Sequence, residues 1–111
     1  MIALVLLAGV AGALVRFIVV RSLPAPWAVL SVNVAGSLLG GLLLASTSGD
    51  VRLIVLTGFC GGLTTFSTLS VETIQFALEG KMRLAVLGVL GNFGVGIGAA
   101  FAGYAIGSLL N

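Results

Sequence analysis

The chain has 111 residues, of which 59% are hydrophobic and 7% are charged: five Lys or Arg and three Asp or Glu. Soluble domains are about one quarter charged, so this chain has too little polar surface for water and is expected to fold in a lipid bilayer. Its net charge of +2 provides no basic face, which excludes nucleic acid as a partner. Without His, and with Cys60 as the single cysteine, it offers no zinc ligand set, catalytic triad or internal disulfide, and we predict no enzyme activity.

Charged residues and turn signals divide the chain into four apolar spans. The predicted helices cover residues 1–20, 27–45, 53–78 and 84–110. A spanning helix needs about 20 residues, so four helices and short loops account for residues 1–111 as a single all-α membrane domain. The first span is expected to be retained, because a signal peptide carries its basic residues before the apolar run and here they follow it. Four spans place both termini on the same side of the membrane.

Glycine is the second compositional signal, with 17 residues, most of them inside the spans. Pairs at i and i+4 are Gly36/Gly40, Gly58/Gly62, Gly94/Gly98 and Gly103/Gly107. This spacing lets helix backbones approach closely in lipid, so most of these glycines are expected to serve packing. Four thin helices can hardly enclose a passage, and we therefore expect at least a dimer.

The third span contains an unusual stretch at its centre. A Gly61-Gly62 step is followed by five hydroxyl residues within residues 64–70. Glycine and β-branched Thr weaken a helix, so we predict that this helix is broken at its centre. A break inside a membrane frees backbone carbonyls that can coordinate a cation such as Na⁺ and amides that can meet an anion. The alternative is an unbroken helix whose hydroxyls bond to their own carbonyls.

Three further polar residues each allow two interpretations. Asn33 and Asn92 are the amide side chains within the second and fourth spans. Each either bonds between helices or donates to an ion in a narrow pore. Arg16 either extends to the headgroups or places a positive charge in a vestibule that attracts anions.

The residue types missing from the spans narrow the mechanism. A proton-coupled carrier needs a titratable group deep in the membrane, and a cation channel favours rings of acidic residues. Arg16 and Glu72 lie near span ends, and His is absent. A neutral lining of amides, hydroxyls and aromatic ring edges suits a small anion instead, because the ring edge carries the positive side of the aromatic quadrupole.

Residues 58–72 read GFCGGLTTFSTLSVE and resemble the signature of the fluoride channels known as Fluc or CrcB. Asn33 within VNVAGS (residues 32–37) and Arg16-Phe17 also resemble that family. The resemblance implies four-helix subunits that form antiparallel dimers with two pores and pass fluoride passively. HF enters cells as a neutral molecule and is trapped as F⁻, so such a channel lets fluoride leave down its gradient.

The resemblance also assigns roles to individual residues. It implies that a Na⁺ ion lies at the dimer centre, held by the backbone carbonyls of Gly61 and Thr64. It places Arg16 in the anion vestibule. The predicted fluoride pore consists of Asn33, Phe66, Ser67, Thr68, Leu69 and Asn92.

Four positions depart from the family pattern. Leu69 stands where the family usually has a second Phe, and Val29, Gly88 and Gly96 replace residues that are often polar. Because each family pore takes its two Phe positions from different subunits, this chain is not expected to build two full pores alone. The alternative function is therefore a weakly conducting or non-conducting structural partner in a heterodimeric fluoride channel.

The loop charges give a predicted orientation. Loops one and three hold Arg21, Lys81 and Arg83, whereas the opposite side holds Arg52. By the positive-inside rule, loops one and three face the cytoplasm in the cell membrane. This bias favours an antiparallel heterodimer with a paired homologue over a homodimer of oppositely inserted copies. A small multidrug-type carrier, also four helices, is disfavoured because the first span has no acidic residue.

Overall fold

The structure is a computed structural model that describes residues 1–110. Its helices, with η for a wide π-type segment, are α1 (Ile2–Ser22), α2 (Trp27–Ser46), α3 (Gly49–Arg52), η1 (Leu53–Cys60), α4 (Gly61–Leu63), α5 (Ser67–Leu78), α6 (Met82–Leu90), η2 (Gly91–Val95) and α7 (Gly96–Leu110). In this described part of the chain they form four helices long and apolar enough to cross a membrane: Ile2–Ser22, Trp27–Ser46, Gly49–Leu78 and Met82–Leu110. The predicted all-α fold with four spans is confirmed.

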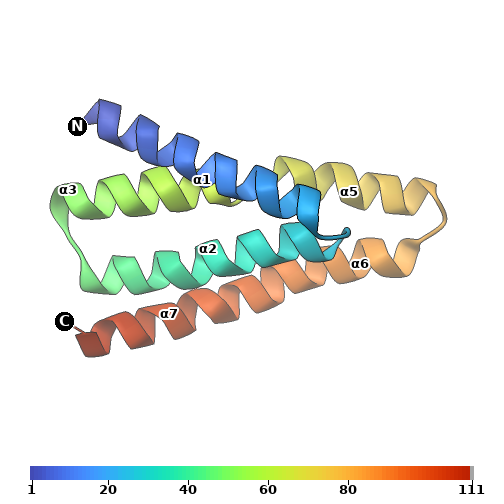
Figure 1. Ribbon diagram of the computed structural model, residues 1–111. Helices are drawn as coiled ribbons and strands as arrows, with labels where there is room; N and C mark the ends of the chain where they lie inside the picture. The colour runs from blue at the N-terminus through green and yellow to red at the C-terminus, as the bar shows by residue number, and fades with distance from the viewer. Residues whose placement is uncertain (111) are drawn as a thin grey trace.

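The four spans lie side by side as an elongated bundle (Figure 1). The N-terminus, α3 and the end of α7 lie at one end of the bundle, and the turn between α5 and α6 lies at the other. The third span begins at Gly49, before the predicted residue 53. Gly49 has φ +61°, a left-handed conformation that favours glycine and turns the chain from the preceding loop into α3.

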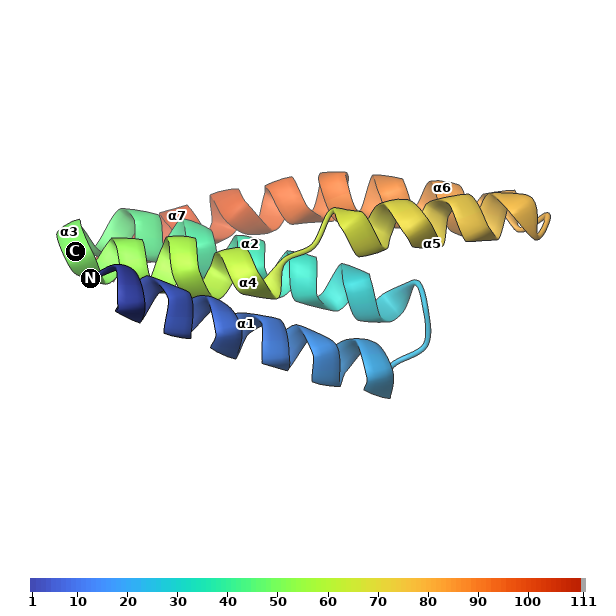
Figure 2. The ribbon, with the colours of Figure 1, turned by 90° about the horizontal axis from the view of Figure 1, so that it is seen from above.

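The third span changes neighbours at its break. Its first half, η1 and α4, packs on α1, whereas its second half, α5, packs on α6. Figure 2 shows the extended segment that joins α4 to α5. Helix α4 continues through Leu63 and the chain becomes extended at Thr64, the last residue of the Gly61 to Thr64 stretch where the break was predicted. The predicted broken third helix is therefore confirmed.

Glycines let the helix backbones come close together. The most extensive packing joins α2 to α7, where a Cβ at Gly103 would collide with the Leu38 carbonyl and one at Gly41 with the Ala100 carbonyl. Where α4 meets α1, a Cβ at Gly62 would collide with the Gly9 carbonyl. Lipid tails are as apolar as large apolar side chains, so burying such side chains does not drive membrane helices together. Small residues promote association instead, because they let the helix backbones pack closely.

Much of the apolar surface of this single chain is uncovered. Within α1, Gly12 is the only buried residue. The buried apolar core is small and consists of Ala28, Val29, Val32, Cys60, Leu63, Leu69 and Ala85. Large apolar side chains such as Leu7 and Phe101 are well exposed. Such a surface requires lipid or another subunit around it.

Candidate functional site

The break in the third span consists of three residues between two helices. Thr64 has extended backbone angles of φ −81° and ψ 155°, and α5 resumes at Ser67 after Phe66. In a continuous helix the Thr65 N–H would donate to the Gly61 carbonyl. It is redirected here, and backbone groups at membrane depth must then find other partners. The structure provides those partners from the second and fourth spans.

Asn33 of α2 binds both backbone groups of Thr65. Its Oδ1 accepts the Thr65 N–H at 2.7 Å, and its Nδ2 donates to the Thr65 carbonyl at 3.0 Å. The side-chain amide thus pairs with the N–H and C=O of one residue, much as a residue of a neighbouring antiparallel β-strand would. Thr65 is 8% exposed, so these two groups would otherwise be buried without a hydrogen bond. Asn33 stabilises the break.

Asn92 of η2 extends this network to the fourth span. Its Nδ2 donates to the Gly88 carbonyl at 2.7 Å, which directs its Oδ1 toward Asn33. Asn33 Nδ2 donates to that Oδ1 at 2.6 Å. A backbone acceptor at Gly88 and a backbone donor at Thr65 therefore fix the orientation of both amides. The interhelix interpretation holds for both side chains, and each N–H of Asn33 has an acceptor within the chain.

Hydroxyl groups complete the break. The Thr65 Oγ1 accepts the Thr68 N–H at 3.1 Å and lies 3.3 Å from the Thr68 Oγ1. This bond satisfies one of the first amides of α5, as a capping side chain does at a helix N-terminus. The Thr64 hydroxyl donates to the Cys60 carbonyl at 3.1 Å. A hydroxyl bonded to a carbonyl of its own helix was the alternative to a broken helix. Thr64 makes such a bond, and the helix is nevertheless broken there.

A groove of about 350 Å³, called the amide groove below, runs beside the break. It is lined by Asn33, Ser37, Thr64, Thr65, Phe66, Leu69, Asn92, Phe93, Gly96, Ile97 and Ala100. Four of the predicted pore residues meet there, namely Asn33, Phe66, Leu69 and Asn92. The predicted residues Ser67 and Thr68 lie outside its lining.

Sequence reasoning missed three polar or aromatic residues of the amide groove. Ser37 follows Asn33 by one helical turn, a spacing that could have identified it. Thr65 belongs to the break itself. Phe93 directly follows Asn92, and neighbouring residues on a regular helix point in different directions, so its place in the groove carried no clear sequence signal.

A larger groove of about 650 Å³, called the glycine groove below, lies mainly against α2, α7 and the first half of the third span. Its lining includes Gly36, Gly40, Gly41, Leu56, Gly61, Phe101 and Tyr104, and it shares Ser37, Thr64, Ile97 and Ala100 with the amide groove. The two grooves are therefore neighbours along one side of the bundle.

Arg16 of α1 reaches the break. Its Nη1 donates to the Thr64 carbonyl at 3.3 Å, and the side chain is half-buried. Thr64 directly follows α4, so the guanidinium lies at the negative end of the first half of the third span. This contact favours the interpretation of Arg16 as a fixed charge beside the site over that of a side chain extended to the headgroups.

The backbone carbonyls of Gly61 and Thr64 are oxygen ligands, the ligand type that discontinuous membrane helices offer to a cation such as Na⁺. The Gly61 carbonyl lacks its helical donor from Thr65, because Asn33 accepts that N–H. Gly61 is exposed and lines the glycine groove together with Thr64. A carbonyl oxygen has two lone pairs, so the Thr64 carbonyl can accept Arg16 and still face a cation, although the two positive charges would repel each other.

Comparisons with known proteins identify the family of the chain. Residues 3–104 match the family model described as CrcB-like protein, Camphor Resistance (CrcB). A protein of Nocardia farcinica named fluoride-specific ion channel FluC 1 is 43% identical over 91% of this chain and 76% of its own length. The fluoride-specific ion channel FluC of Thermus thermophilus is 41% identical over 96% of this chain and 94% of its own length. With four spans, a broken third helix and these matches along nearly its whole length, the chain belongs to the CrcB family.

Proposed function

We propose that this chain is a subunit of a fluoride-selective passive channel that exports cytoplasmic fluoride. Relatives about 40% identical over most of the chain are named as fluoride-specific channels, which supports this function. The observation that carries the proposal is the amide groove, where two amide side chains, hydroxyls and phenylalanine rings meet at a broken membrane helix. Arg16 adds a positive charge at Thr64, on the edge of this groove.

The groove suits an anion that must enter and leave quickly. Ring edges and hydroxyl dipoles attract an anion through partial charges, whereas both N–H groups of Asn33 already have acceptors within the chain. The groove lining contains only uncharged residue types, and a fixed charge there would either hold fluoride too tightly or repel it. Fluoride trapped in the cytoplasm after HF entry would leave down its own gradient, so no coupling ion is needed.

A second subunit is proposed to close the path. Both grooves are open on the single chain, and four helices do not enclose a passage between them. An antiparallel dimer would place the glycine groove of one subunit against its partner and bring two broken third spans together. A Na⁺ ion between them would be held by the carbonyls of Gly61 and Thr64, where it would neutralise carbonyl charge and join the subunits. The partner is either a second copy or a paired homologue.

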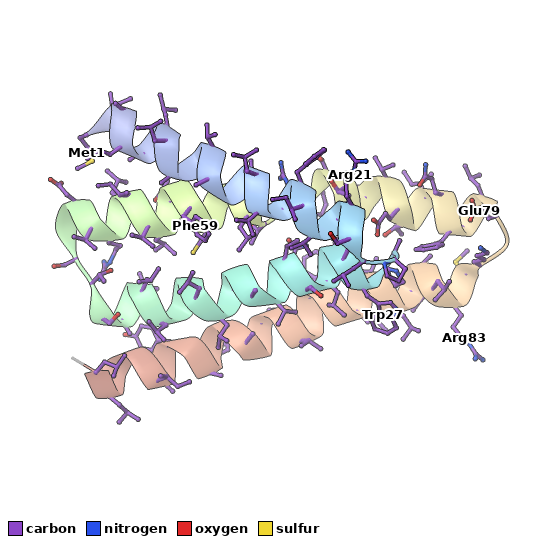
Figure 3. All side chains as sticks on the ribbon, viewed as in Figure 1. Met1, Arg21, Trp27, Phe59, Glu79 and Arg83 are labelled. Carbon is purple, nitrogen blue, oxygen red and sulfur yellow. The ribbon has the colours of Figure 1, made fainter. Side chains whose placement is uncertain are left out.

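The charge distribution supports a proposed orientation. Arg21 and Arg83 lie toward the end of the bundle that holds the α5–α6 turn, and Met1 lies at the opposite end (Figure 3). Lys81 is in the same turn, where it lies 3.7 Å from Glu79. By the positive-inside rule this end faces the cytoplasm, with the protein in the cell membrane. The bias favours a heterodimer of oppositely oriented homologues.

Reconstitution of the purified chain in liposomes tests the proposed function. Liposomes loaded with KF and diluted into fluoride-free buffer should release fluoride rapidly when valinomycin lets K⁺ follow, and parallel liposomes loaded with KCl should retain chloride. A fluoride electrode and a chloride electrode measure the two fluxes. Fluoride release that requires an added, oppositely oriented homologue would indicate the structural-partner role. Equal release of chloride, or no release with either preparation, would refute the proposal.

A further inference from the structure

The amide groove contains phenylalanine rings from two different spans. Phe66 belongs to the break and is 70% exposed, and Phe93 belongs to η2 and is 51% exposed. Both rings line the groove together with the amides of Asn33 and Asn92. A ring whose edge faces this groove would present an anion with the positive side of its quadrupole.

The backbone around Phe93 explains its place in the groove. Residues Gly91–Val95 form a wide π-type turn, in which successive side chains point closer to the same direction than in a regular α-helix. Asn92 and Phe93 are consecutive and yet line the same groove. Such π-type turns often occur at functional sites.

Leu69 offers no comparable group. It is 5% exposed, and its Cδ1 lies 3.9 Å from where a Cβ on Gly88 would be. Leu69 therefore packs as part of the groove wall close to the fourth span. Its side chain has no quadrupole, so it provides bulk without a positive edge.

We propose that Phe93 supplies the second ring edge of the fluoride path in this chain. Phe66 supplies the first from the third span, and Phe93 of the fourth span takes the role that Leu69, which has no ring, does not fill. The inference rests on the proposed channel function and assigns to Phe93 a role in anion selection. The alternative is a ring that faces only lipid or a partner helix. These two roles differ in what an aliphatic replacement would do.

The test compares fluoride flux of Phe93→Ile with that of the wild type, with Phe66→Ile as the positive control. Loss of the ring edge should lower flux roughly fivefold, which corresponds to about 1 kcal/mol. Phe93→Tyr keeps the ring and should retain most of the flux. Phe17→Ile is the matched negative control, because Phe17 is 56% exposed, stacks on Arg21 and lines neither groove. Size-exclusion chromatography would show whether each variant assembles like the wild type.

The outcomes separate this inference from the channel function itself. Wild-type flux with unchanged flux in Phe93→Ile overturns the role of Phe93 and leaves the channel intact. A wild type that conducts no fluoride, alone or with a homologue, overturns both. If Phe93→Ile fails to assemble, Phe93→Met carries the same expectation, since Met is also aliphatic and, being unbranched, is better tolerated in a helix.

Discussion

Asn33 holds the break through three hydrogen bonds, and its replacement by Leu should destabilise the protein strongly. The variant loses the bonds of 2.7 and 3.0 Å to the Thr65 backbone and the bond of 2.6 Å to Asn92 Oδ1. Thr65 and Asn92 are each 8% exposed, so three polar groups are left buried without these partners. Each such group costs about 1–3 kcal/mol, which gives a range of about 3–9 kcal/mol. Water entering from the groove can satisfy part of this loss, so we expect about 3–5 kcal/mol.

A series of variants makes this expectation quantitative. Asn92→Leu leaves both Thr65 bonds in place and removes one acceptor from Asn33. It also removes a donor from the Gly88 carbonyl, which still accepts the Gly91 N–H, so we expect about 1–2 kcal/mol. The double variant should lose less than the sum of the single variants, because the bond between the two amides is counted in both. Ser31→Ala is the control on the same helix. Its hydroxyl is exposed and bonds to the Trp27 carbonyl of its own helix, so its loss should change stability by less than about 0.5 kcal/mol.

Unfolding in mixed detergent micelles, followed by the fluorescence of Trp27, measures these differences. Hydrogen exchange of the Thr65 amide gives a local measure, since its protection depends on Asn33 Oδ1. An Asn33→Leu variant as stable as Ser31→Ala, with an equally protected Thr65 amide, would show that Asn33 does not stabilise the break. Additive effects of Asn33→Leu and Asn92→Leu would show that the two side chains are not coupled.

Three further predictions concern packing, charge and the ion. Gly103→Ala should destabilise the bundle by about 1–3 kcal/mol, because its Cβ would collide with the Leu38 carbonyl, whereas Gly98→Ala, with nothing within 4 Å, should have little effect in thermal unfolding. Arg16→Gln should lower fluoride flux at low ionic strength more than at high ionic strength and more than Arg21→Gln does; equal effects in both salts would exclude a steering charge. Replacing Na⁺ with a bulky organic cation should weaken the proposed dimer on size-exclusion chromatography, and an unchanged dimer would exclude the proposed sodium site.

The sequence alone determined the membrane fold and its four spans. In lipid each backbone N–H and C=O needs a hydrogen-bond partner within the protein, and a helix provides these partners within one segment. A long apolar segment is therefore expected to cross the membrane as a helix. The weak helix material at Gly61-Gly62 and the Thr residues after it also located the break to within a few residues. Its position at Thr64 rather than at the glycines depended on α1, since Gly62 packs against the Gly9 backbone while still helical.

Only the tertiary structure decided which side chains meet at the break. Asn33 and Asn92 are 59 residues apart and bond to each other because α2 and the fourth span pack together with their amides facing inward. Phe93 lines the amide groove because of a π-type turn that the sequence did not predict. Hydropathy is a property of each segment and can be read from composition, whereas these contacts depend on how each helix is rotated and where its neighbour approaches. The sequence therefore identified some of the polar residues of the proposed anion site, and packing determined which residues share one groove.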